Sequence, residues 1–156
     1  QRQMCIRDRA LQERADLLNN IERLQARIRN NALVQEGEEP AENPKGLIKE
    51  LDACIERLGY LASRINKTNN ETKIGDMTIT EVIAKKDALV IKARAYRDFV
   101  FEASSMTARA RGTEIKIIPT IKVTELQKTV DKVSKEIRLL DNSLQATNWS
   151  TDLIED

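Results

Sequence analysis

Apolar residues in the last third of the chain recur at the spacing of a packed helix. They advance in steps of 4-3-4-3-4 and comprise Leu126, Val130, Val133, Ile137, Leu140 and Leu144, while the residues between them are almost all polar or charged. This spacing places all six on one face of a helix. Since such a face needs a cover, the pattern predicts a helix from 124 to between 142 and 147 that packs against another helix.

Earlier segments carry the same signal. The 4-3 spacing predicts a first helix over 11–30, on Leu17, Ile21, Leu24 and Ile28, and a second over 45–66, on Leu47, Leu51, Cys54, Leu58, Leu61 and Ile65. A third helix is expected to begin after Thr78, because Thr78 and Glu81 have the spacing of a capping box, and to continue to about 105. Its apolar residues cover more than one side, so we expect it to contact more than one neighbour.

The connections between these helices are short. Residues 32–44 form an acidic loop broken by Gly and Pro, and 66–77 is a polar connection that ends in Gly75-Asp76. Short connections favour antiparallel neighbours. We therefore predict a mainly α fold: an antiparallel up-down-up-down four-helix bundle with long, coiled-coil-like helices.

The segment 113–123 departs from the helical pattern. It alternates apolar and polar residues, is rich in β-branched side chains and contains Pro119, which predicts a short strand at an edge or kink. Thr124 and Gln127 then have capping-box spacing at the start of the last helix. An unpaired strand leaves backbone N–H and C=O groups without partners. A second copy of the chain would supply them, so we predict a homo-oligomer, a dimer or higher, with an interface at Ile115, Ile117, Ile118, Ile121 and Val123.

The first nine residues differ in character from the rest. They read QRQMCIRDR and resemble the translation of a sequencing-adaptor remnant. We expect the natural sequence to begin near Ala10 and residues 10–156 to form a single helical domain. A disulfide from Cys5 is then not expected, and Cys54, on a helical stripe, is predicted to be a buried free thiol.

Composition excludes several classes of function. The 26 basic and 25 acidic residues leave a net charge of +1, so nothing favours nucleic acid. No apolar run approaches the roughly 20 residues of a membrane span, and we see no signal peptide, which favours the cytoplasm. The absence of histidine removes histidine-based triads, di-iron sites and His-containing zinc sites. We expect no catalytic residues, no metal site and no cofactor, and therefore no enzyme.

Two polar clusters could still form a site. Glu36, Glu38, Glu39 and Glu42 of the acidic loop could gather a divalent cation, or could form a solvated loop facing Arg109 and Arg111 at the same end of the bundle. At the other end, near Trp149, amides could hold a polar ligand or could cap helices: Asn66, Asn69, Asn70, Asn142 and Asn148. We favour the structural interpretation of both.

Several segments together resemble a family of small bacterial proteins. They are Val34-Gln35-Glu36-Gly37-Glu38-Glu39-Pro40, Arg64-Ile65-Asn66-Lys67-Thr68-Asn69, Glu114-Ile115-Lys116, Leu126-Gln127-Lys128 and Asn148-Trp149-Ser150-Thr151. The family is often labelled "septicolysin", which implies a cytolytic toxin. The residues do not support that activity, because the chain shows no strongly cationic amphipathic helix and no long apolar hairpin that could insert.

The function predicted from the sequence is therefore a non-enzymatic, cytoplasmic helical homo-oligomer that acts through protein–protein contacts. Two alternatives remain: a membrane-active, cytolysin-like protein, and a metal- or ligand-binding helical protein.

Overall fold

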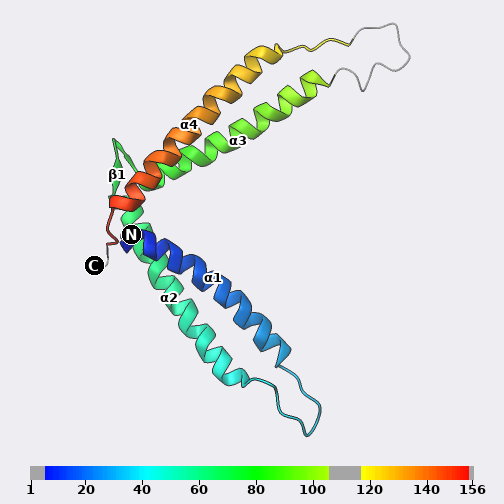
Figure 1. Cartoon of the computed structure of the whole chain (residues 1–156), viewed down its shortest axis with the longest axis vertical. Coiled ribbons are helices and arrows are strands. Elements are labelled where there is room, and N and C mark those ends of the chain that lie inside the picture. Colours follow the sequence, from blue (N-terminus) through cyan, green and yellow to red (C-terminus); the bar gives the residue numbers. More distant parts are fainter. Residues whose placement is uncertain (1–5, 106–116, 155–156) are drawn as a thin grey trace, which may run out of the picture. The chain divides into compact units, whose positions relative to one another are not determined.

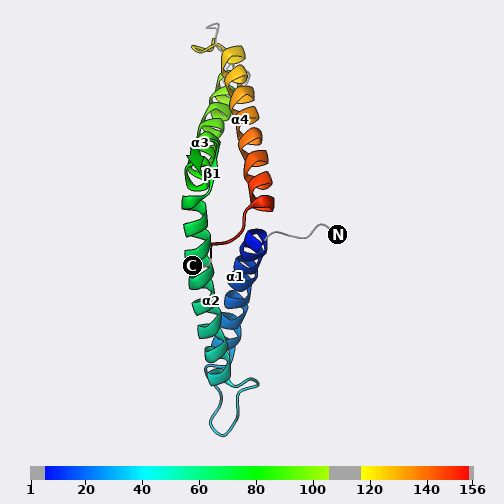
Figure 2. The same cartoon turned by 90° about the vertical axis from the view of Figure 1, so that its left-hand side faces the viewer.

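A computed structural model describes residues 6–105 and 117–154, which form four helices and one β-hairpin (Figure 1). The elements are α1 (Ile6–Asn30), α2 (Pro44–Glu71), β1 (Lys73–Ile74), β2 (Met77–Thr78), α3 (Ile79–Ser104) and α4 (Val123–Ser150). Both views place α1 beside α2 and α3 beside α4 (Figures 1 and 2). The prediction of a mainly α fold with long, packed helices is confirmed. The chain divides into two compact units, residues 1–73 with 147–156 and residues 74–146.

The first unit is built on the α1/α2 pair. Leu24 of α1 has no exposed surface, and Ala10 forms a buried cluster with Leu61 and Ile65 of α2. Leu153, from the segment after α4, packs against the same cluster. The 4-3 pattern of both helices therefore faces inward, as the sequence predicts.

The start of α2 follows from its local sequence. The side chain of Asn43 accepts a hydrogen bond of 3.1 Å from the backbone N–H of Lys45, and Pro44 occupies the first helical position, where no N–H is needed. The end of α2 corrects the sequence analysis, because residues 66–71 continue the helix instead of forming a polar connection. The apolar seam does not stop at Ile65, since position 68 lies on the same face.

The second unit begins at Ile74, within the two-stranded hairpin of β1 and β2. Its turn is Gly75-Asp76, and Gly75 has a φ of +64°, a conformation that glycine adopts without steric cost. The predicted capping box at the start of α3 is confirmed: the Thr78 hydroxyl accepts from the Glu81 N–H, and the Glu81 carboxylate accepts from the Thr78 N–H. Capping and hairpin together fix where α3 begins.

The α3/α4 pair packs through side chains. Ile79 and Val82 of α3 and Leu144 of α4 form its buried cluster. Ion pairs between the helices join Lys85 to Glu136 and Lys86 to Asp141. Lys86, near the start of α3, pairs with Asp141, whereas Arg97, further along α3, donates to Ser134, which lies earlier in α4. The two helices therefore run antiparallel.

The prediction of a strand near 113–123 is wrong for the residues of this segment that the structure describes. Residues 113–116 lie outside the described residues, and 117–122 belong to no strand. Pro119 lacks an N–H for a ladder, whereas Gly75-Asp76 permits the tight turn that lets 73–78 pair. The β segment therefore forms elsewhere than the side-chain alternation predicts.

Two local predictions are also wrong. The helix α4 begins at Val123, and the carbonyl of Lys122 accepts from the N–H groups of Glu125 and Leu126, so Thr124 lies inside the first turn and is not a cap. Cys54 is a free thiol as expected, but it is half-buried, and its sulfur accepts a hydrogen bond from the Asn20 amide at 3.5 Å. A pair of helices is too thin to enclose every position of its seam.

Candidate functional site

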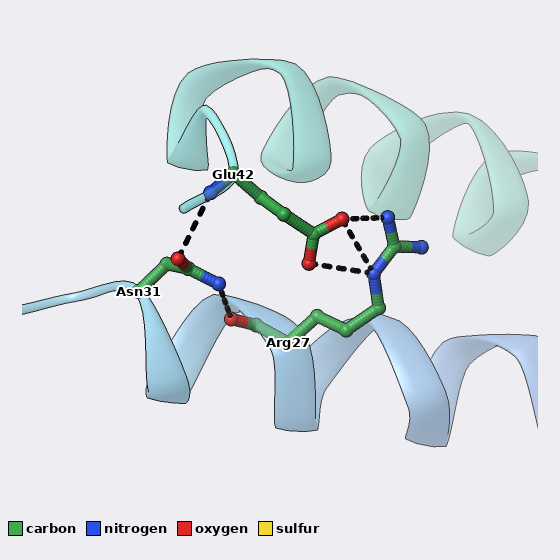
Figure 3. Close-up of polar contacts among 3 residues, drawn as sticks. All are labelled: Arg27, Asn31 and Glu42. Atoms are coloured by element: carbon green, nitrogen blue, oxygen red, sulfur yellow. Dashed lines mark hydrogen bonds and ion pairs between the residues drawn. The ribbon is translucent and has the colours of Figure 1, made fainter. Parts of the chain in front are cut away.

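The acidic loop is closed by one polar cluster, formed by Arg27, Asn31 and Glu42 (Figure 3). The Arg27 guanidinium makes an ion pair with the Glu42 carboxylate, with Nε 3.1 and 3.0 Å from its two oxygens. The Asn31 amide donates to the carbonyl of Arg27 at 2.9 Å, and its oxygen accepts from the Glu42 N–H at 3.0 Å. The hydrogen bonds from Arg27 lower the pKa of Glu42. This cluster caps the end of α1 and anchors the loop.

The remaining carboxylates of the loop form no site in the structure. Glu36, Glu38 and Glu39 are exposed, and among the described residues no group of three or more Cys, Asp or Glu side chains could hold a metal ion. Arg109 and Arg111, the expected partners, lie outside the described residues. The observed partner of Glu42 comes instead from the helix before the loop, a pairing that sequence spacing alone does not single out.

A second cluster joins α1 and α2. Arg57 donates to Glu13 at 2.7 and 3.1 Å, and this hydrogen bonding lowers the pKa of Glu13. The guanidinium groups of Arg57 and Arg64 lie over the ring of Tyr60, at 5.4 and 5.2 Å from its centre. These contacts hold both arginines along α2.

The five asparagines of the proposed polar site lie on helices. Asn66, Asn69 and Asn70 occupy the last turns of α2, and Asn148 lies near the end of α4. Asn142 belongs to the second unit and is exposed. The Asn148 side-chain oxygen and the Arg64 Nε are buried without a hydrogen-bond partner among the described residues. The structural interpretation that we favour for these amides, and the alternative of a polar ligand, both stay predictions.

Thr68 is the residue that sequence analysis missed in this region. It is fully buried, its hydroxyl donates to the Arg64 carbonyl at 2.8 Å, and it accepts from the N–H of Ile154 at 3.0 Å. The hydroxyl therefore fastens the segment after α4 to α2. Position 68 continues the 4-3 steps of Leu61 and Ile65, and that spacing could have identified it.

The predicted oligomer interface contains three exposed apolar side chains among the described residues of the second unit. Ile117, Ile118 and Ile121 are 42%, 72% and 52% exposed, while Val123 is half-buried at the start of α4 and Ile115 lies outside the described residues. Phe99 and Phe101 of α3 are 48% and 70% exposed. A cavity of about 310 Å³ lies between Phe99, at the end of α3, and 117–121.

The helices of the described residues do not include a membrane-spanning one. None combines the length and the apolar character that crossing a bilayer requires.

Comparisons with known proteins identify a family and a solved structure that are similar to this chain. A family described as "Family of unknown function (DUF6847)" matches residues 14–153. The chain is also similar to the crystal structure of a functionally unknown conserved protein from Corynebacterium diphtheriae, with 34% sequence identity and a TM-score of 0.87 over 97% of this chain and 100% of that chain. No curated protein matches the chain.

Proposed function

The chain belongs to this family of unknown function, and we propose that it is a non-enzymatic, cytoplasmic helical protein that forms a homo-oligomer and acts through protein–protein contacts. The observation that carries the proposal is the exposure of large apolar side chains at 117–121 and on the adjoining end of α3. Large exposed apolar patches on a folded protein mark interaction sites. Ile118 illustrates the point, because 72% of its surface is exposed.

Packing within the unit supports the proposal. On α3, the buried residues are Ile79, Val82 and Ala93, all in its first three-fifths. Toward its end, Phe99 and Phe101 are exposed although each offers a large apolar surface. Burying such a side chain contributes about 1.5–3 kcal/mol, so a second copy that covers this end would be stabilised.

Light scattering of the purified chain tests the proposal. The wild-type chain is expected to be at least a dimer at micromolar concentration. Placing a charge on the exposed surface by Ile118→Asp should weaken the assembly by about tenfold or more, since a buried carboxylate loses its hydration. Thr120→Asp is the matched control, because it adds the same charge to an exposed neighbour of lower apolar area. A monomeric wild type contradicts the proposal, and so does an assembly that both variants leave intact.

The resemblance to septicolysin-labelled proteins implies a lytic activity, and our proposal predicts none. Vesicles of phosphatidylcholine and phosphatidylglycerol loaded with a self-quenching dye are the test. The purified chain should release no more dye than buffer does. Release that rises with protein concentration would replace our proposal with the membrane-active alternative.

A further inference from the structure

Two groups of charged residues on α3 lie on different sides of the helix. One group faces α4: the Lys85 ammonium lies 3.1 Å from Glu136, the Lys86 ammonium lies 2.9 Å from Asp141, and Arg97 donates to the Ser134 hydroxyl at 3.2 Å. These contacts come from both flanks of the buried seam on which Val82 and Ala93 lie. The side chains that α4 covers are thereby identified.

The other group lies away from α4. Asp87 and Arg94 are exposed, and neither has a hydrogen-bond or ion-pair partner among the described residues. Between them lie Val90 and Ile91, which are 39% and 69% exposed. The four positions 87, 90, 91 and 94 have the spacing i, i+3, i+4, i+7, so they share one stripe of the helix. We name these four residues the outer stripe.

We propose that the outer stripe binds the outer stripe of a second copy in antiparallel orientation, across a two-fold axis between residues 90 and 91. This inference rests on the proposed homo-oligomer and specifies its contact. An interface around a two-fold axis must be self-complementary: if Asp87 contacts Arg94 of the partner subunit, Arg94 contacts Asp87 of the partner subunit. The outer stripe meets this condition, because its acid and its base are equally distant from its apolar centre.

The charges also select the orientation. A parallel pairing in register would place Asp87 against Asp87 of the partner subunit and Arg94 against the partner's Arg94, and like charges in contact repel. The antiparallel pairing forms two ion pairs and buries Val90 and Ile91 of both copies between them. A different protein would need its own acid and base at this spacing, whereas a second copy has them by symmetry.

The position of the axis determines how far two copies of α3 overlap. Residues 90 and 91 lie close to the middle of α3, which spans Ile79–Ser104. Two antiparallel copies would therefore overlap along nearly the whole helix, about 39 Å for 26 residues. Residue 104 of one copy would be level with residue 77 of the other. The exposed isoleucines of 117–121, which adjoin this end of α3, would then be level with the β-hairpin of the partner subunit.

Charge reversal tests the pairing. Asp87→Arg and Arg94→Asp should each weaken dimerisation by about tenfold, because each places like charges in contact twice. The double variant, with both substitutions, should recover the wild-type dissociation constant to within about threefold, since it restores both pairs in reverse. Asp52→Arg on α2 is the control, being an exposed charge reversal in the other unit, and should change nothing. Circular dichroism confirms that each variant keeps its helices.

Disulfide trapping provides an independent measurement. In a background with Cys5→Ser and Cys54→Ser, Ile91→Cys should form a disulfide-linked dimer on mild oxidation, because the two copies of residue 91 flank the axis. Leu139→Cys on α4, which is 56% exposed in the wild type, should not. A wild-type dimer with unchanged affinity in both single variants, or a double variant that fails to recover, overturns the antiparallel pairing and leaves the homo-oligomer standing. A monomeric wild type defeats the proposed function itself.

Discussion

Thr68→Val tests the buried link between α2 and the segment after α4. Valine keeps the branched shape of threonine but replaces the hydroxyl by a methyl group. The variant removes the acceptor that the Ile154 N–H uses, at 3.0 Å in the wild type. It also removes the donor to the Arg64 carbonyl, which already accepts a backbone N–H within the helix.

The expected cost follows from these two losses. A hydrogen bond of this kind contributes about 0.5–1.5 kcal/mol net, and a donor left buried without a partner costs about 1–3 kcal/mol. The Ile154 N–H belongs to a segment outside any helix or strand and can turn toward water, so the lower range applies. The added methyl group regains part of the loss through apolar burial. We expect the free energy of unfolding to fall by about 1 kcal/mol, which lowers Tm by about 2–4 °C.

Amide hydrogen exchange separates this link from a general loss of stability. In the Val variant, the Ile154 N–H should exchange much faster. The exchange rates of the N–H groups near Leu24 should change only by the amount that the loss of global stability accounts for. Thr68→Ser is the matched control, because it keeps the hydroxyl and loses only the methyl group. Unchanged protection of Ile154 in the Val variant would refute the link.

Two further predictions concern a pair of glycines and one ion pair. Gly59→Ala should raise the free energy of unfolding by about 0.5–1 kcal/mol, since Gly59 lies within α2 and an added Cβ meets open space. Gly75→Ala should lower the free energy of unfolding by about 1–2 kcal/mol, because Gly75 has a φ of +64°. Urea unfolding measures both changes, and changes of the same sign would contradict the turn geometry. The hydrogen bonds from Arg27 lower the pKa of Glu42, so its stabilising contribution is complete above the ordinary pKa of a glutamate and is lost as the pH falls through the lowered value. Glu42→Gln should therefore have a lower Tm than the wild type at pH 7, and the difference in Tm should shrink as the pH falls below the ordinary pKa of a glutamate. Glu38→Gln, on the same loop, should match the wild type throughout.

The helices could be predicted because each carries a long, regular seam. On α4, residues such as Leu126 and Val133 are buried as the 4-3 spacing requires. The start of α3 was predictable for a different reason, since Thr78 and Glu81 specify both hydrogen bonds of the capping box within four residues. In both cases local chemistry and the apolar pattern favour the same structure.

The features that could not be predicted depend on contacts between distant residues. The end of α2 continues beyond the Asn-rich turn signals, where the Thr68 hydroxyl accepts a hydrogen bond from the Ile154 N–H. Ile154 lies over eighty positions away in the sequence. The segment 117–122 has the composition of a strand but belongs to none, because β structure requires a partner as well as a propensity. The local sequence specifies neither of these partners.

The same reasoning explains why the sequence specifies the fold of this chain more clearly than its function. The ion pairs of the described residues hold helices and loops together: Glu42 closes a loop on α1, and Lys86 joins α3 to α4. The apolar residues that remain outside, such as Ile91 and Ile118, are those that packing within one chain leaves uncovered. We propose that a second copy of the chain covers them, so the oligomeric state of the chain is the measurement that tests our functional assignment.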